Sequence, residues 1–274
     1  MVIDLLTIKY LPDYHKTFSM ISKNKIKFIL SLQKKKVRDE KRQYVIEGDK
    51  LVKEYLLAGI RFHLLAAKPE FIASLLPDEK GIIDEIEQLS YEDLKRVSSL
   101  KSPHNAVGVV PIPEYETAMD EIFEDLCVAL DFIQDPGNLG TIIRAAAWFG
   151  IRNIICSENC VDVYNPKVIQ ATMGAILNVR IHYSDLGSFL PLALEKNLPV
   201  FGAVLEGDSI YSQKLGSKGV ILLGNESKGV SGDLSRYITQ KIKIPGFNNA
   251  KYGIDSLNVS MAAAVIFSEF ARRR

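Results

Sequence analysis

The sequence predicts an α/β protein, with a C-terminal, mostly parallel sheet that has helices on both faces and a small α/β domain before it. From residue 126 onward, short apolar runs alternate with segments of helical spacing, which is typical of a parallel sheet covered on both sides. Several of these runs stop directly at polar segments that contain glycine. Open α/β sheets bind ligands at the carboxyl ends of their strands, so we expect a functional site at that edge.

The composition is that of a globular protein without an overall charge preference. The chain has 274 residues, 47% of them hydrophobic and 24% charged, which is enough for one large domain or two ordinary ones. Because 34 basic residues stand against 33 acidic ones, any surface that binds nucleic acid must be local. No apolar run approaches the ~20 residues of a membrane span, and no signal peptide is recognisable. We therefore expect no membrane contact.

The cysteines indicate a reducing environment. There are only three, Cys127, Cys156 and Cys160, and this small, odd number fits a cytoplasmic protein better than a disulfide-linked one. No histidine lies beside Cys156 or Cys160 in the sequence. We therefore expect a cytoplasmic protein without a metal site.

Residues 1–42 are expected to form an N-terminal arm that is basic from about residue 22. Nine lysines and arginines lie between residues 22 and 42, against two acidic residues, and apolar residues interleave with them. This pattern predicts a basic amphipathic helix. One interpretation is a solvated helix face. The other is a phosphate-contacting arm that uses Lys34, Lys35 and Lys36, because clustered cations release counterions from a nucleic acid.

A proline-containing acidic segment, residues 113–125, is predicted to link two domains. The domain before it, residues 43–112, is expected to be a small α/β unit. Its predicted strands are residues 44–48, 62–66, 82–86 and 106–110, and its predicted helices are residues 49–58 and 91–97.

The domain after the linker, residues 126–274, carries the regular alternation of strands and helices. Strands are predicted at residues 127–133, 153–157, 179–183, 199–204, 220–223 and 241–244. Helices are predicted at residues 141–149, 166–177, 187–196, 231–238 and 257–271. Trp148 and Phe149 are expected in the core. Loops at residues 134–140, 205–209 and 224–229 each follow a strand, and we expect them to meet.

These loops lack the signatures of the common nucleotide-binding folds. A dinucleotide fingerprint needs GxGxxG after the first strand and an acidic residue on the next strand. Gly137 and Gly140 supply only two glycines, and no acidic residue closes the strand at residues 153–156. The chain has no GxxxxGK[ST] segment, which excludes a P-loop.

Three segments, in chain order, resemble the motifs of the SpoU (TrmH-like) RNA ribose 2′-O-methyltransferases. The first is DFIQDPGNLGTIIRAA at residues 131–146. The second is Gly224-Asn225-Glu226 with Gly229. The third is Ile244-Pro245 followed by SLNVS at residues 256–260. Each motif alone is weak evidence, but three in order make a specific resemblance.

The resemblance covers the chain from about residue 126 to its end, and residues 44–110 resemble, less specifically, the family's L30e-like substrate-binding domain. It implies a SPOUT fold, in which the C-terminal chain threads a deep trefoil knot, and S-adenosylmethionine as cofactor. The implied activity is methyl transfer to a ribose 2′-hydroxyl of rRNA or tRNA. It also implies a homodimer, for which the last helix offers apolar residues: Leu257, Met261, Ala264, Val265 and Phe267.

The resemblance assigns roles to individual residues. The active-site positions of the family match Asn138, Arg144, Glu226, Ser256 and Asn258. Cofactor contacts would fall at Gly224, Ile244 and Leu257, with Leu205, Glu206 and Gly207 nearby. The chain departs from the family in the link at residues 246–255, which is several residues longer than usual. No cofactor contact can be transferred onto that link.

The implied chemistry is an in-line displacement limited by positioning and by the weak nucleophilicity of a neutral hydroxyl. The enzyme must orient the hydroxyl and stabilise or remove its proton. Arg144 could bind the neighbouring phosphate with two hydrogen bonds. Arginine is a poor base because its side chain stays protonated in proteins, so a role in deprotonation would need the RNA phosphate as well.

Simpler interpretations stay open at each position. Arg144 could be a partner in a surface salt bridge, Glu226 a helix-capping carboxylate, and Asn138 a turn or N-cap residue. For the whole chain, the alternative is a catalytically inactive RNA-binding protein that keeps the methyltransferase fold.

Overall fold

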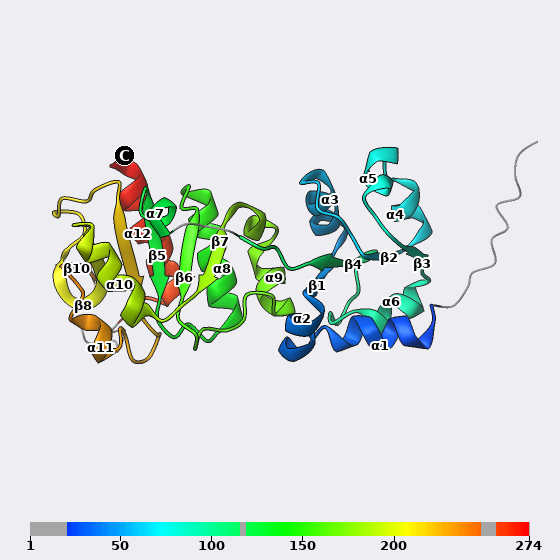
Figure 1. The fold of residues 1–274 in the computed structure, drawn as a ribbon, viewed down its shortest axis with the longest axis horizontal. Helices are drawn as coiled ribbons and strands as arrows, with labels where there is room; N and C mark the ends of the chain where they lie inside the picture. The colour runs from blue at the N-terminus through cyan, green and yellow to red at the C-terminus, as the bar shows by residue number, and fades with distance from the viewer. Residues whose placement is uncertain (1–20, 116–118, 248–255, 274) are drawn as a thin grey trace, which may run out of the picture.

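The computed structural model describes residues 21–115, 119–247 and 256–273. Figure 1 shows two α/β units along the long axis of the molecule, the first in blue to blue-green and the second in green to red. This confirms the predicted α/β class. The first 20 residues of the predicted arm, and residues 116–118 of the predicted linker, lie outside the described residues. Among the described residues, no helix combines the length and apolar character that crossing a membrane requires.

The second unit is built on a six-stranded sheet with the strand order β10-β8-β9-β5-β6-β7. Every neighbouring pair in it is parallel. The central strands β5 and β9 are buried along their whole length, which explains their uninterrupted apolar sequences. The strands are β5 (Leu126–Leu130), β6 (Asn153–Cys156), β7 (Arg180–Tyr183), β8 (Val200–Ser209), β9 (Gly219–Leu223) and β10 (Gln240–Lys243).

Helices cover both faces of this sheet. Successive residues of a strand point to opposite faces. Val128 of β5 therefore packs in one core with residues of α8 and α12, whereas Ala129 packs in another with residues of α7, α10 and α11. The helices are α7 (Met119–Ile122), α8 (Pro136–Trp148), α9 (Pro166–Thr172), the 3₁₀ turn η1 (Ala175–Asn178), α10 (Leu186–Glu195), α11 (Gly232–Ser235) and α12 (Val259–Arg272).

Two predicted loops need correction. The first, residues 134–140, is mostly helix: α8 begins at Pro136 because Asp135 caps it, its Oδ1 accepting the N–H of Asn138 at 2.8 Å. Proline suits the first helical position. The second, residues 205–209, belongs to β8. Its residues 203–207 lie opposite a register shift between Lys241 and Ile242 of β10, so this part of the strand bulges.

The first unit contains a four-stranded sheet with the order β1-β4-β2-β3. β4 is antiparallel to β1 and β2, and β3 is parallel to β2. The strand predicted at residues 82–86 is only partly right: Ile83 forms an isolated parallel bridge with Phe62, and the strand itself begins at Ile86 as a largely exposed edge. The elements are β1 (Gln43–Glu47), α3 (Asp49–Leu57), β2 (Leu64–Ala67), α4 (Pro69–Ala73), α5 (Pro77–Gly81), β3 (Ile86–Gln88), α6 (Tyr91–Val97) and β4 (Ala106–Pro111).

The basic segment forms two helices instead of one, α1 (Lys23–Ser31) and α2 (Lys35–Lys41). The break lies where Arg38 Nη1 donates to the carbonyls of Leu32 and Gln33, both at 2.8 Å, and so satisfies backbone groups at the end of α1. Lys34, Lys35 and Lys36 are exposed at the start of α2. They are therefore accessible to a ligand.

The two units share one hydrophobic core. The rings of Tyr44 in β1 and Tyr164 in the second unit lie 4.7 Å apart between centroids. The buried guanidinium of Arg38 pairs with Asp162. The two units are therefore held together by packed side chains as well as by the chain that links them.

Two residues lie on the opposite side of their helices from the side that we expected. Trp148 is 84% exposed, because the buried side of α8 is formed by other positions, among them Ile142 and Ala146. Phe149 does pack, partly buried, against the core. Phe267, expected on the outer face of the last helix, is fully buried, so it is unavailable for a dimer contact.

The predicted knot depends on the path of residues 248–255, which lie outside the described residues. On the near side of this gap, β10 ends at Lys243; on the far side, α12 begins at Val259. The long link noted in the sequence falls almost wholly within the gap.

We predict that Asp162→Ala lowers the free energy of unfolding by about 3–5 kcal/mol, because it leaves the Arg38 side chain, 3% exposed, without its carboxylate. Urea denaturation followed by circular dichroism measures the loss. The matched control is Asp39→Ala, which removes the carboxylate from the exposed pair with Lys35 and should change little. Equal stability of Asp162→Ala and wild type would contradict the importance of the buried pair.

Candidate active site

The loops after β5 and β9 form one hydrogen-bonded surface. The two strands are parallel neighbours, with Leu130 paired to Leu223, so both loops leave the same edge of the sheet. Asn225 joins them, its Nδ2 donating to the carbonyl of Phe132 at 2.9 Å. The buried carboxylate of Asp131 accepts the N–H of Ser231 at 2.7 Å. These contacts bring together two of the three loops that we expected to meet.

Three side chains from separate segments form a chain of hydrogen bonds at this surface. Asn138 of α8 donates from Nδ2 to Glu226 Oε1 at 2.7 Å, across 88 residues of sequence. Asn258 donates from Nδ2 to Asn138 Oδ1 at 3.0 Å, across 120 residues. The fold thus brings together three of the five predicted active-site residues. We call Asn138, Glu226 and Asn258 the amide–carboxylate chain.

Asn258 has a second role as the N-cap of α12. Its Oδ1 accepts the N–H of Ser260 at 3.0 Å and the Ser260 hydroxyl at 2.6 Å. Because the oxygen is used for the cap, the amide nitrogen is left to face Asn138. Ser256 and Leu257 precede the cap and are exposed. Among the described residues, Ser256 makes no hydrogen bond to the amide–carboxylate chain.

Arg144 lies on the exposed side of α8. Arg144 comes six residues after Asn138, which places it about 9 Å farther along the helix axis. Its Nη1 donates to Met173 Sδ at 2.9 Å. Across residues 21–115, 119–247 and 256–273, no carboxylate lies within ion-pair distance of it, so the salt-bridge interpretation finds no partner there. A guanidinium carries five donors, and those that remain could bind a planar anion such as phosphate.

Met173 is a residue that sequence reasoning missed. It reaches Arg144 because the chain reverses sharply after α9, with φ of 48° at Met173 and 85° at Gly174. The φ of Gly174 favours glycine, and a Cβ there would lie 1.9 Å from Glu54 Oε2 of α3, which would have to move. The turn that contacts Arg144 therefore also contacts the first unit. A methionine in a left-handed conformation is uncommon, and no local pattern indicated it.

The predicted cofactor residues lie along the same edge of the sheet. Gly224 follows β9 and Ile244 follows β10, whereas Leu257 immediately precedes the cap of α12. A Cβ on Gly224 would lie 2.2 Å from backbone atoms of Gly229 and Val230, so a larger residue would push the second loop outward. The glycine lets the backbone of this loop close on itself.

Leu205, Glu206 and Gly207 lie in the bulged part of β8. Leu205 is 59% exposed and Leu257 is 51% exposed, so two large apolar side chains face outward at the edge where a ligand is expected. Apolar surface beside polar loop groups suits a ligand with a flat apolar part and a polar end. The residues present therefore fit a nucleoside-containing cofactor such as S-adenosylmethionine.

A buried thiol supports the first loop. Cys160 Sγ accepts the N–H of Ile133 at 3.2 Å. Hydrogen bonding to Cys156 above all, with further hydrogen bonds from Ser157 and Ile133, lowers the pKa of Cys160 to about 7 against the opposing effect of burial. Both cysteines are buried, so their part in the site is to hold the loop in place.

We predict that Asn258→Ala lowers the free energy of unfolding by about 1 kcal/mol, because it removes the cap of α12. Asn258→Asp is the matched control: it keeps an oxygen for the cap but loses the donor to Asn138. Thermal denaturation should place the aspartate variant close to wild type and the alanine variant below it. If both variants lose the same stability, the cap is not what Asn258 contributes.

Comparison with known proteins identifies both parts of the chain. Residues 125–268 match the SpoU rRNA Methylase family, and residues 23–108 match the MRM3-like substrate binding domain. Among curated proteins, 23S rRNA (guanosine(2553)-2'-O)-methyltransferase RlmP of Bacillus subtilis is 28% identical over 244 residues, which are 88% of this chain and 94% of that protein.

Two solved structures superimpose over nearly the whole chain. A protein of the TrmH family from Porphyromonas gingivalis has a TM-score of 0.83 at 34% identity, covering 93% of this chain and 100% of that one. An AdoMet-bound rRNA methyltransferase from Sinorhizobium meliloti has a TM-score of 0.77 at 28% identity, covering 94% and 97%. The chain belongs to the SpoU rRNA methylase family.

Proposed function

We propose that this chain transfers the methyl group of S-adenosylmethionine to a ribose 2′-hydroxyl of rRNA and that Arg144 holds a phosphate next to the reacting ribose. Family membership supports the reaction. The names of RlmP and of the Sinorhizobium meliloti enzyme favour rRNA over tRNA. When bound, the cofactor supplies the methyl group as an electrophilic sulfonium.

The observation that carries this proposal is the state of Arg144. Arg144 is exposed on α8, the helix whose first turn contributes Asn138 to the amide–carboxylate chain. Its hydrogen-bond partner is the uncharged thioether of Met173, which does not neutralise the charge of the guanidinium. A surface arginine without a carboxylate partner can bind RNA phosphate through two parallel N–H···O bonds. That contact would fix the ribose beside the phosphate in position for attack.

The amide–carboxylate chain would hold the reacting surface in one geometry. Glu226 accepts from Asn138 through Oε1. Because Glu226 is exposed, its other oxygen can accept a hydrogen bond from a substrate hydroxyl. Ser256, also exposed, is the remaining predicted active-site residue and would contribute its hydroxyl from the start of the third motif. We assign Arg144 positioning and charge stabilisation, because its guanidinium offers hydrogen-bond donors and a positive charge.

The alternative is a protein that binds RNA without turnover. No described residue of the predicted set is diverted into a contact that would block the site: Glu226 has one carboxylate oxygen outside the chain of hydrogen bonds, and Arg144 has donors beyond the one given to Met173. This arrangement favours an active enzyme.

We further propose that the first unit selects the RNA, with Lys34, Lys35 and Lys36 as phosphate contacts. Lys35 also pairs with Asp39 at 2.8 Å, an exposed interaction that an RNA phosphate could replace. By contrast, Arg38 in the same basic segment is buried against Asp162 and is structural. The basic segment therefore divides into an exposed part and a buried part.

A homodimer is our proposal for the outer face of α12. Met261 is exposed there, Ala264 and Val265 are partly exposed, and Leu257 is exposed just before the helix. Met261, Ala264 and Val265 also line a shallow cavity of about 310 Å³ with Tyr211. A second copy would cover this apolar surface.

We also assign the protein to the cytoplasm. Its three cysteines are buried free thiols, which suits a reducing compartment.

We predict that Arg144→Ala retains the fold and the affinity for S-adenosylhomocysteine but slows methyl transfer by about two to three decades. Loss of one transition-state contact costs on the order of 3–4 kcal/mol. Arg144→Lys should recover little, because an ammonium cannot reproduce a planar two-pronged contact. Single-turnover methylation with saturating cofactor, on rRNA from a strain that lacks the protein, measures the rate.

The matched control is Arg152→Ala. Arg152 is an exposed arginine that follows the C-terminal end of α8 and pairs with Asp125. The control variant should methylate at the wild-type rate. Near-normal turnover of Arg144→Ala would show that Arg144 does not contribute to methyl transfer and that other residues carry out the reaction.

A separate prediction concerns the exposed lysines. Replacing Lys34, Lys35 and Lys36 with glutamine should weaken RNA binding and make it less dependent on salt, by up to about one log–log slope unit per phosphate contact. Filter binding between low and high salt gives the slope. The control replaces Lys214 and Lys218, exposed lysines of the second unit, with glutamine. Equal slopes for the triple variant and wild type would exclude the lysines as phosphate contacts.

A further inference from the structure

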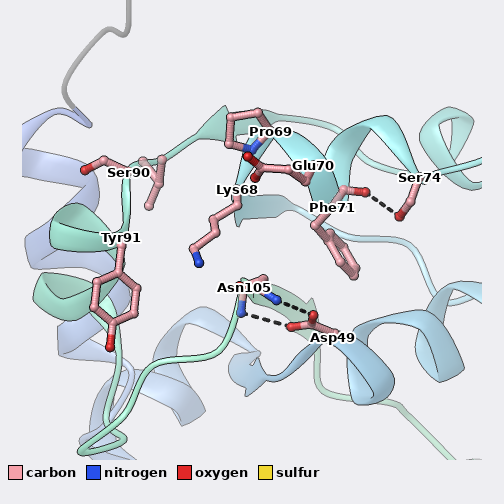
Figure 2. Close-up of a pocket in the computed structure, with 10 residues that line it drawn as sticks. Asp49, Lys68, Pro69, Glu70, Phe71, Ser74, Ser90, Tyr91 and Asn105 are labelled. Carbon is pink, nitrogen blue, oxygen red and sulfur yellow. Dashed lines mark hydrogen bonds between the residues drawn. The ribbon is translucent and has the colours of Figure 1, made fainter.

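The first unit contains a cavity of about 650 Å³ that no part of the proposed reaction uses. It opens where β2 and β3 end and where α4 and α6 begin, as Figure 2 shows. The predicted catalytic and cofactor residues all belong to the second unit, so this cavity is separate from the candidate active site. Its size is within the roughly 300–1,000 Å³ of sites that hold small ligands.

Tyr91 and Lys68 line one side of the cavity, and a second lysine, Lys95, lies beside the Tyr91 ring without lining the cavity. Tyr91 is 41% exposed, and the ammonium groups of Lys68 and Lys95 lie 5.1 Å and 4.8 Å from its ring centroid. Lys95 is paired with Glu92 at 3.0 Å. Within the part of the chain that the structure describes, Lys68 has no carboxylate at ion-pair distance. Figure 2 shows its ammonium directed into the space between Tyr91 and Asn105.

The remaining polar groups of the cavity are mostly acceptors. Asn105 donates to Asp49 twice, from its backbone N at 2.9 Å and from Nδ2 at 2.6 Å. Those two bonds satisfy the Asp49 carboxylate and leave Asn105 Oδ1 as an acceptor. Glu70 adds an exposed carboxylate. A bare phosphate would suit Lys68 but not Glu70, whereas a nucleotide offers both a phosphate and the amino groups of a base.

We propose that this cavity binds one unstacked nucleotide of the substrate RNA, with its base against Tyr91 and its phosphate at Lys68. The inference rests on the proposed function, because it takes RNA as the substrate. Residues 23–108, which contain the whole cavity, match a substrate binding domain. Aromatic side chains accept bases of any sequence on their faces, and a lysine beside the ring adds attraction for the backbone.

A contact far from the reacting ribose has a physical purpose. Every ribose of an rRNA offers the same hydroxyl, so the reacting group itself cannot tell the enzyme which nucleotide to modify. Binding energy from a distant part of the substrate can make that choice. A nucleotide held in the first unit would set which ribose reaches the second unit.

The experiment uses the full-length protein and rRNA from a strain that lacks it. Tyr91→Ala should weaken RNA binding roughly tenfold or more, since loss of one base stack has that effect. It should raise KM for RNA by a similar factor. The single-turnover rate at saturating RNA and the affinity for S-adenosylhomocysteine should stay at wild-type values.

Tyr91→Phe keeps the ring and should bind RNA like wild type. Lys68→Gln should weaken binding and reduce its salt dependence, whereas Lys80→Gln, an exposed lysine outside the cavity, should do neither. Ultraviolet crosslinking followed by mass spectrometry should find a nucleotide on the peptide that contains Tyr91. Melting temperatures confirm that each variant is folded.

Wild-type RNA affinity in Tyr91→Ala, with no crosslink to this peptide, would overturn the assignment and would leave a protein ligand as the occupant to examine. An equal loss in Tyr91→Phe and Tyr91→Ala would also overturn it, because the ring would then not be the binding element. Failure of the proposed function looks different: wild type itself would transfer no methyl group, whether or not the RNA binds to the cavity.

Discussion

The candidate site depends on the hydrogen bonds through which Asn138 joins Glu226 to Asn258. Each hydrogen bond contributes only about 1 kcal/mol net, so these contacts cannot assemble the site alone. The buried sheet supplies the framework, because β5 and β9 are paired along their length and deliver their loops to one edge. Caps at Asp135 and Asn258 then place the first turns of α8 and α12. The polar chain selects one arrangement of segments that the core has already brought close.

The two units are connected close to Arg144 as well as through their common core. The turn at Met173 and Gly174 touches Arg144 on one side and Glu54 of α3 on the other. A change in how the first unit packs would therefore move a side chain that contacts the proposed phosphate-binding arginine. The buried pair of Arg38 and Asp162 opposes such a change. The RNA recognition that we propose for the first unit and the methyl transfer that we propose for the second would thus depend on one interface.

The sequence predicted the α/β class and the parallel sheet, because buried parallel strands have uninterrupted apolar runs. Motif resemblance also placed Asn138, Glu226 and Asn258 together. What failed depends on contacts distant in sequence: Arg38 looked like a solvated cation until its partner Asp162, in the other unit, was visible. β8 continues through predicted loop residues because β10 pairs with its far end. Trp148 is exposed because other positions of α8, such as Ile142 and Ala146, form the side of the helix that packs on the core. The cavity beside Tyr91 could not be predicted from the sequence, because its lining residues come from several separate segments.

The most direct test of the account is a map of 2′-O-methyl groups in rRNA from a strain without this protein, before and after incubation with the purified chain and S-adenosylmethionine. The account predicts that one ribose position lacks its methyl group in that strain and regains it with wild-type protein. An identical methylation map with and without the protein, and no methyl transfer to that rRNA or to tRNA in vitro, would contradict it.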